Sequence, residues 1–330
     1  MSSPKRLAIC GYGRFGAALA ELALGRGYRV TAYDPTAAIP AELRASSLEE
    51  LCAGNENLLL AVPLEHFEAS LRALQPHLRS EHLVLDVGSV KLEPVRAMQE
   101  LLGDDVDWLG THPLFGPTSL ARGDRPLRVV LTEGSAAGPS RARALWQDLG
   151  CECIEQSAET HDRAMARSHA LAFFLAKGLL QIKAGEGAAF TPPSFEAIGK
   201  TITAVRSDAG HLFRAIQNRN PFAAEERDRL IDALRDIHAE LKLPAGTSSP
   251  LSAQIPRLEE PDAKEPEAGA LLAELDQELV ALLARRMLLA GRLSPMDRSL
   301  QVEALAKAAT RIGFAPDQAA ILSTLLEKSS

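Results

Sequence analysis

The chain has 330 residues, 46% of them hydrophobic, and this length is enough for two domains and a third small one. Its formal net charge of -7 argues against nucleic acid as a partner, because nucleic-acid binding needs a basic face. No apolar run approaches the roughly 20 residues of a membrane span, and residues 7–10 are too short for the core of a signal peptide. The four cysteines form neither a CxxC pair nor a metal-ligand spacing. We therefore expect a reduced, cytoplasmic protein with no nucleic-acid, membrane or metal partner.

The first half of the chain alternates short apolar runs with amphipathic stretches. The apolar runs predict strands at residues 7–10, 29–33, 58–62, 83–87, 108–111 and 128–132. The amphipathic stretches predict helices at residues 14–26, 64–74, 91–102 and 140–149. Continuous apolar strands separated by helices are typical of a parallel sheet that is covered on both faces.

After about residue 156 the pattern becomes helical and stays helical to about residue 243, with breaks near Pro192 and Pro221. Several prolines lie among serines and acidic residues between 244 and 268, which predicts a linker. A last helical segment follows. The expected organisation is an α/β domain at 1–156, an all-α domain at 157–243, the linker 244–268, and a small helical domain at 269–330.

A glycine motif follows the first predicted strand directly and opens the first predicted helix. Gly11, Gly13 and Gly16, with Arg14 and Phe15 between the last two, form the pattern GxGxxG. The first glycine permits a tight turn, the second lets the backbone approach a pyrophosphate, and the third lets the helix pack closely on the strand. The helix N-terminus stabilises the phosphate charge. The motif predicts a Rossmann domain in which these five residues form the cofactor-binding loop.

Asp34 ends the second predicted strand, on the side of the sheet where the cofactor is expected. A carboxylate at this place accepts hydrogen bonds from the adenosine ribose hydroxyls and repels a 2′-phosphate. The residue therefore favours NAD over NADP as the cofactor. The alternative is that Asp34 only shapes the turn before Pro35.

Two candidate catalytic residues follow later strands. His112 lies in the segment GTHPLFGP, which predicts a rigid loop just after a strand, and Ser89 lies in DVGSVK after the fourth predicted strand. Because ligands of open α/β sheets bind beyond the carboxyl ends of the strands, both side chains are expected at one nicotinamide ring. A histidine there can take a hydroxyl proton while a hydride leaves the same carbon. Ser89 can instead be the N-cap of the next helix, and we expect Lys91 to be a solvated helix residue.

A third candidate element is HDRAMARSHA, residues 161–170, which starts the long helix of the second half. His161 and His169 lie on roughly one face of a helix, and we expect His169 to face the cleft. His161 and Asp162 can simply cap the helix.

The glycine motif, DVGSVK, GTHPLFGP and HD…SH, in this order and spacing, resemble the prephenate/arogenate dehydrogenase family of tyrosine biosynthesis over about residues 7–243. The resemblance implies a Rossmann domain followed by an all-α domain that dimerises, with the active site in the cleft between them. It places the family's catalytic histidine at His112 and its hydroxyl-orienting serine at Ser89. The implied reaction is the NAD-dependent oxidative decarboxylation of prephenate to 4-hydroxyphenylpyruvate, by a homodimer and without a metal.

Two positions depart from the family's pattern. A second histidine, common three residues after the Ser-His pair, is Ala172 here, and a carboxylate-binding arginine is Thr203. Lys200 and Arg206 lie one turn either side of Thr203 on the same helical face, so we expect one of them to bind the substrate carboxylate. The missing histidine keeps arogenate open as the substrate.

Two other functions stay open. One is a Rossmann reductase that acts on a hydroxy acid or an imine, which leaves the His112 segment unexplained. The other is a non-catalytic nucleotide-binding regulator, which Thr203 and Ala172 favour. Residues 269–330 resemble an all-helical chorismate mutase that keeps Arg286 and Arg298 but lacks other charged positions. We expect this small α-helical domain to have no mutase activity.

Overall fold

A computed structural model describes residues 5–207 and 210–242 of the chain, together with scattered positions between 276 and 304. The chain divides into two compact units, Met1–Pro117 with Leu127–Leu258 and Thr118–Pro126 with Glu259–Ser330. The first unit contains the sheet and the helices that position the site. The predicted linker lies outside the described residues, as do Arg298 and most of the expected mutase-like domain, so both stay predictions.

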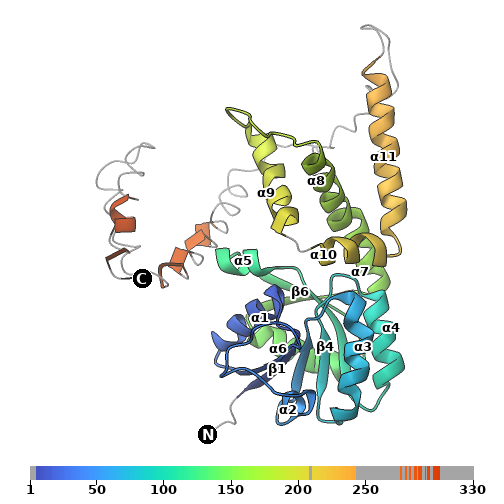
Figure 1. The fold of residues 1–330 in the computed structure, drawn as a ribbon, viewed down its shortest axis with the longest axis vertical. Helices are drawn as coiled ribbons and strands as arrows, with labels where there is room; N and C mark the ends of the chain where they lie inside the picture. The colour runs from blue at the N-terminus through green and yellow to red at the C-terminus, as the bar shows by residue number, and fades with distance from the viewer. Residues whose placement is uncertain are drawn as a thin grey trace. The chain divides into compact units, whose positions relative to one another are not determined.

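A seven-stranded sheet lies at the centre of the first unit (Figure 1). Its strands are β1 (Arg6–Cys10), β2 (Arg29–Tyr33), β3 (Asn57–Leu60), β4 (Leu83–Asp86), β5 (Asp107–Pro113), β6 (Leu127–Gly134) and β7 (Cys151–Glu155). Their order is β2-β1-β3-β4-β5-β6-β7. Strand β2 lies on one side of β1 in the sheet, and β3 lies on the other side. This reversal creates the crevice in which open α/β sheets bind ligands.

The first five strands are parallel, as predicted, but β6 runs antiparallel to β5, and β7 is parallel to β6. The expectation of an entirely parallel sheet is therefore wrong at this edge. A parallel connection needs a helix that returns along the strand, whereas β5 and β6 are joined through the six-residue helix α5 (Pro117–Arg122). Strand β7 was not predicted, because its sequence CECIE alternates apolar and acidic residues and forms an exposed edge.

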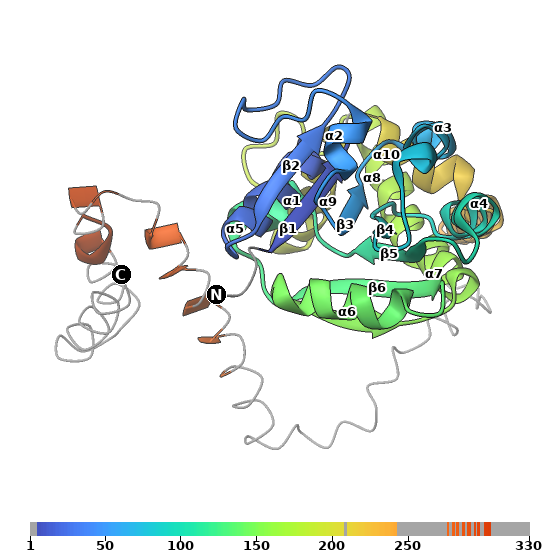
Figure 2. The same ribbon diagram turned by 90° about the horizontal axis from the view of Figure 1, so that it is seen from below.

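Helices cover both faces of the sheet (Figure 2). They are α1 (Arg14–Leu24), α2 (Leu48–Cys52), α3 (Leu64–Leu74), α4 (Leu92–Leu102) and α6 (Gly138–Asp148). One core cluster joins Leu51, Phe67 and Met98 of α2, α3 and α4 to Leu58 of β3 and Trp108 of β5. Right-handed crossovers place α1 on the opposite face, and because β6 and β7 run in the reverse direction they place α6 there as well.

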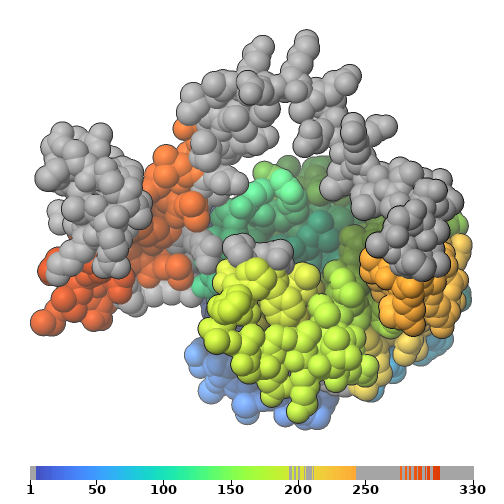
Figure 3. All heavy atoms as spheres, turned by 90° about the horizontal axis from the view of Figure 1, so that it is seen from above, coloured from blue at the N-terminus to red at the C-terminus, as the bar shows by residue number. Residues whose placement is uncertain are grey.

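The chain continues as helices after β7. They are α7 (Ala158–Met165), the π-helical turn η2 (Ala166–Ala170), α8 (Leu171–Gln181), α9 (Pro193–Ser207), α10 (His211–Arg214), the π-helical turn η3 (Ala215–Arg219) and α11 (Ala223–Glu240). A second core cluster, which includes Phe173, Ile202 and Ile216, holds them together. The buried Gln217 donates a hydrogen bond of 2.7 Å to the carbonyl of Ala170 and so joins the two π-helical turns. Viewed from above, α8, α9 and α11 form adjoining surfaces (Figure 3).

Two further properties bear on the expectations above. Cys10, Cys52, Cys151 and Cys153 are all free thiols. Among the described residues, no helix is both long and apolar enough to cross a membrane.

Candidate functional site

The three motif glycines occupy positions that only glycine fits or that leave space for a ligand. Gly11 has a φ of +98°, and a Cβ on it would lie 2.6 Å from the carbonyl oxygen of Ala61. A Cβ on Gly16 would lie 2.0 Å from the carbonyl oxygen of Gly11, so α1 packs against the turn. A Cβ on Gly13 would meet no described atom within 4 Å. The loop therefore has the closed turn and the open second glycine that a pyrophosphate cradle at a helix N-terminus needs.

The Asp34 carboxylate holds this loop and the turn after β2 at the same time. One oxygen accepts a hydrogen bond of 2.8 Å from the backbone N–H of Tyr12, and the other accepts bonds from the N–H groups of Thr36 and Ala37 and from the Thr36 hydroxyl. Partial burial alone would raise the pKa of Asp34, but these hydrogen bonds outweigh it and lower the pKa. The residue is thus a fixed, ionised carboxylate beside the glycine loop, and it also shapes the turn before the chain continues.

The segment after β4 is built on a buried ion pair. Lys91 and Asp86 are fully buried, and the Lys91 ammonium donates hydrogen bonds to the Asp86 carboxylate and to the carbonyl of Thr111. Asp86 also accepts bonds from the backbone N–H groups of Gly88, at 2.9 Å, and Thr111, at 3.1 Å. The expectation of a solvated Lys91 is wrong, because its side chain turns back under the sheet edge to neutralise Asp86.

Ser89 lies half-buried in the turn between β4 and α4. Helix α4 begins at Leu92 with Lys91 at the N-cap position, so Ser89 is not the N-cap. Within the described ranges its hydroxyl makes no hydrogen bond. The side chain is therefore available to a substrate hydroxyl or to the cofactor at the carboxyl end of β4.

His112 lies inside β5, where it pairs with Val130 of β6, and not in a loop after the strand as predicted. The residue is 4% exposed. Strand β5 runs beyond the end of β4, whose last residue Asp86 pairs with Gly110. His112 is thereby placed at the carboxyl edge of the parallel strands. Phe115, just after β5, packs on Phe15 of α1 with ring centroids 6.3 Å apart, so the glycine loop and the His112 segment are adjacent.

A second buried histidine contacts His112. The Nδ1 of His112 lies 2.8 Å from Nε2 of His161, and the Nδ1 of His161 lies 2.8 Å from a carboxylate oxygen of Asp162. Helix α7 is capped by Ser157, so His161 and Asp162 do not cap it but lie within it. The Asp162 carboxylate also accepts bonds from the backbone N–H groups of Lys91, at 2.8 Å, and Leu92, at 3.0 Å. It therefore stabilises the first turn of α4.

The surroundings of His112 and His169 favour their neutral forms. Burial lowers the pKa of His112 well below 6.5, and electrostatic interactions with His161, Lys91 and His169 lower it further. Burial and then His161 lower the pKa of His169 to about 4. His112 can therefore accept a proton at neutral pH, whereas His169 can offer a hydrogen bond but no positive charge.

The remaining predicted substrate residues lie in the helices after β7. His169 is in η2 and packs edge-on against Phe173, with ring centroids 4.5 Å apart. Lys200 and Arg206 are in α9, and their side chains lie outside the described part of the structure. The Thr203 hydroxyl is exposed and donates back to the carbonyl of Gly199 at 2.8 Å. It therefore provides no substitute for a cationic side chain.

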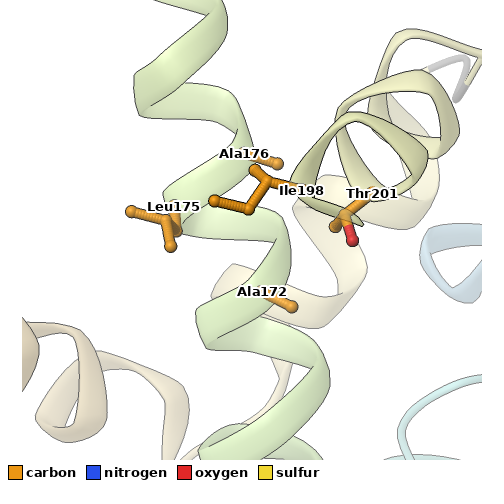
Figure 4. Close-up of a pocket in the computed structure, with 5 residues that line it drawn as sticks. All are labelled: Ala172, Leu175, Ala176, Ile198 and Thr201. Carbon is orange, nitrogen blue, oxygen red and sulfur yellow. The ribbon is translucent and has the colours of Figure 1, made fainter. Parts of the chain in front are cut away.

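An apolar hollow of about 280 Å³ lies between α8 and α9 (Figure 4). It is lined by Ala172, Leu175, Ala176, Ile198 and Thr201. Ala172, where the family pattern often has a histidine, thus leaves space here in place of a polar ring.

The sequence interpretation missed four site residues, Asp86, Lys91, His161 and Asp162. Two signals were available. Asp86 and Lys91 begin and end one short motif, and His161 and Asp162 stand eight and seven residues before His169 on a helix that enters the site. Only the contacts between their buried side chains show which of them pair: Asp86 with Lys91, and His161 with Asp162.

Comparison with known proteins supports one family. The sequence profile described as "Prephenate dehydrogenase, nucleotide-binding domain" matches residues 41–150. The chain is 29% identical over 252 residues to arogenate dehydrogenase 1, chloroplastic, of Arabidopsis thaliana, and 27% identical over 255 residues to arogenate dehydrogenase 2, chloroplastic, of the same plant. These matches cover 70% and 73% of this chain, and 39% and 71% of the relatives.

A solved structure supports the fold. The crystal structure of prephenate dehydrogenase from A. aeolicus, in complex with hydroxyphenyl propionate and NAD+, aligns with a TM-score of 0.59 at 18% identity and covers 73% of this chain and 91% of that one. The profile and the relatives both indicate similarity to the prephenate/arogenate dehydrogenase family, and the solved structure shows the same fold.

Proposed function

We propose that the protein is an NAD-dependent dehydrogenase that converts prephenate to 4-hydroxyphenylpyruvate by oxidative decarboxylation. The observation that carries the proposal is the neutral, buried His112 at the carboxyl edge of the sheet, beside both the Ser89 turn and the glycine loop. The free thiols favour action in the reducing cytoplasm.

The residues of the glycine loop fit a dinucleotide. Gly13 and the first turn of α1, with Arg14 and Phe15, would hold the pyrophosphate, and Asp34 would accept hydrogen bonds from the adenosine ribose. The fixed carboxylate of Asp34 disfavours a 2′-phosphate, which supports NAD. The A. aeolicus prephenate dehydrogenase, whose crystal structure is a complex with NAD+, is consistent with this choice. When bound, NAD+ supplies the acceptor for a hydride.

His112 and Ser89 supply the acid–base chemistry. Neutral His112 accepts the proton of the ring hydroxyl as the C4 hydride leaves, and Ser89 orients that hydroxyl. The electron pair of the breaking O–H bond forms the C4 carbonyl. This carbonyl is conjugated to C1, so the C1 carboxylate leaves as carbon dioxide and the ring becomes aromatic. A weak base suffices here, because departure of the hydride makes the hydroxyl strongly acidic.

A cation is still needed for the carboxylate of the substrate. His169 is neutral at pH 7, so it serves as a hydrogen-bond donor. Lys200 or Arg206 would supply the charge.

A second candidate substrate is arogenate, which carries an amino acid side chain in place of a keto acid. The specific observation is Ala172, which lines an apolar hollow and provides no histidine for a keto acid side chain. The two Arabidopsis relatives are both named arogenate dehydrogenases.

The exposed apolar side chains of the helical region support a homodimer. Leu175, Ile198, Leu234 and Ile237 on α8, α9 and α11 are each more than a third exposed. Pairing two copies through these helices would bury them. Light scattering coupled to size-exclusion chromatography would give twice the mass of one chain, and a monomer at micromolar concentration would contradict this part of the proposal.

The test of the activity is an absorbance assay at 340 nm with purified chain and NAD+. We expect reduction of NAD+ with prephenate, and a separate measurement with arogenate ranks the two substrates by kcat/KM. A hydroxy acid or imine that reacts instead would favour the alternative reductase. No turnover with any of them, together with measurable NAD binding, would favour the non-catalytic regulator.

A further inference from the structure

With Asp162 ionised and His161 neutral, the hydrogen-bonded series Asp162–His161–His112 has one consistent set of donors and acceptors. An ionised carboxylate can only accept, and Asp162 already accepts from two backbone N–H groups at the start of α4. The 2.8 Å contact with Asp162 therefore requires a proton on Nδ1 of His161. In neutral His161 the other nitrogen, Nε2, is then an acceptor.

The same logic fixes His112. Its Nδ1 lies 2.8 Å from the acceptor Nε2 of His161, so Nδ1 of His112 carries the proton. Neutral His112 then has its lone pair on Nε2. The two rings meet edge-on, at an interplanar angle of 83°, which suits a hydrogen bond in the plane of the donor ring.

The surroundings protect these two hydrogen bonds from competing partners. His112, His161 and Asp162 are 4%, 1% and 0% exposed, so no bulk water competes for the two bonds. The ionisable groups whose charges act on His112 are His161, Lys91 and His169, and Lys91 is paired with Asp86. Asn220 donates to the backbone carbonyl of Asp162 at 2.8 Å, which holds α7 against the start of α11. The orienting residues therefore have little freedom to turn.

We propose that His161 and Asp162 are positioning residues that hold His112 in the Nδ1–H tautomer, leaving an unprotonated Nε2 to receive the substrate's hydroxyl proton. The catalytic consequence rests on the proposed function, whereas the tautomer does not. The imidazolium formed on His112 keeps its Nδ1–H bond to His161, and the Asp162 carboxylate stabilises the positive charge through that ring. No proton needs to move from His112 to His161.

The test compares two replacements of His161. In His161→Gln, the side-chain amide can donate to Asp162 and its oxygen can accept from Nδ1–H of His112, so both orienting bonds are kept. His161→Leu keeps an apolar side chain in the buried site but makes neither bond. We expect His161→Gln to stay within about tenfold of the wild-type kcat, and His161→Leu to lose about 100-fold or more, with NAD affinity unchanged in both.

A substrate-free measurement reads the tautomer directly. Nitrogen NMR of the ¹⁵N-histidine-labelled full chain distinguishes a protonated from an unprotonated ring nitrogen, and loss of one signal set in His112→Asn assigns the residue. We expect Nδ1–H at His112 in the wild type and in His161→Gln, and a mixture of tautomers in His161→Leu. Far-UV circular dichroism and urea unfolding confirm that each variant is folded.

The outcomes separate clearly. An Nε2–H tautomer at His112 in the wild type overturns the proposal, whatever the activity. Equal kcat in the glutamine and leucine variants also overturns it, because a packing role or a proton transfer onto His161 would then explain the data better. If the wild type oxidises neither prephenate nor arogenate but shows the Nδ1–H tautomer, the proposed substrate fails while the positioning role stands.

Discussion

The ammonium of Lys91 is fully buried against the carboxylate of Asp86, at the edge of the sheet where the proposed catalytic residues lie. Burial alone raises the pKa of Asp86 and lowers that of Lys91, and each charge opposes the shift of the other. The pair is also bonded to both the N–H and the carbonyl of Thr111, the residue before His112. It therefore fixes the backbone from which the proposed base projects.

Removing one partner of this pair should strongly destabilise the protein. We expect Lys91→Met to lower the free energy of unfolding by about 3–5 kcal/mol, because it leaves the Asp86 charge buried and unpaired. Urea unfolding measures the loss. The matched control is Lys5→Met, since the Lys5–Asp148 pair is largely exposed and should contribute at most about 1 kcal/mol. Equal small losses in both variants would contradict the structural role of Lys91.

His112→Asn tests the proposed base. We expect kcat to fall by about two to four orders of magnitude, the usual contribution of a general base, with little change in the dissociation constant of NAD. Steady-state kinetics and fluorescence titration with NADH give the two quantities. His66→Asn, a change at an exposed histidine of α3, should leave both unchanged. Near-normal turnover of His112→Asn would exclude it as the base.

The low pKa of His112 predicts that the enzyme keeps its activity at mildly acidic pH. The neutral ring is the active form, and burial together with nearby positive charges lowers its pKa well below 6.5. The base form therefore persists as the pH falls through 6.5, and activity is lost only well below that value. We expect kcat/KM to stay constant as the pH falls through 6.5 and to decline only at a pH well below that value. An acid limb centred at or above pH 6.5, absent from a substrate-independent control such as NAD binding, would contradict this prediction.

The resemblance to the family and the glycine loop could be predicted from the sequence because they rest on local signals, whereas the catalytic role of His112 stays a prediction. The glycines of GxGxxG fix the backbone of their own loop, and the end of β1 before them places that loop at the carboxyl edge of the sheet. GTHPLFGP was predicted as a loop, but its first four residues belong to β5. The direction of β6 was not predictable in the same way, because it depends on where the chain goes after α5 and not on the apolar run itself.

The contacts of His161 and Asp162, the proposed positioning residues, could not be predicted for a different reason. Neighbouring residues on a helix usually point apart, so the sequence His161-Asp162 gives no sign that the two side chains bond to each other. Their roles come from contacts with β5 and α4, which are 49 and about 70 residues away in the chain. Lys91 was misread for the same reason, since its partner's position is set by the sheet.

Asp34 should select the cofactor. We expect Asp34→Asn to weaken NAD binding and to bring NADP closer to NAD in kcat/KM, because the repulsion of a 2′-phosphate is relieved. Asp34 also holds Tyr12 and the following turn, so Thr36→Val is the matched control. It removes one bond to the carboxylate but keeps its charge, and the NAD preference should persist. A wild-type enzyme that already prefers NADP would refute this role.

A cation of α9 should bind the substrate carboxylate. His169 cannot supply the charge, since its pKa of about 4 leaves it neutral at pH 7, and Thr203 bonds to its own helix. We expect alanine at Lys200 or at Arg206 to raise KM for the substrate by about tenfold or more with NAD affinity unchanged, because a charged ground-state contact is lost. Arg235→Ala, at an exposed arginine of α11 paired with Asp232, is the control. If Lys200→Ala and Arg206→Ala both keep the wild-type KM, the substrate's charge is met by another residue, and α9 has no part in its recognition.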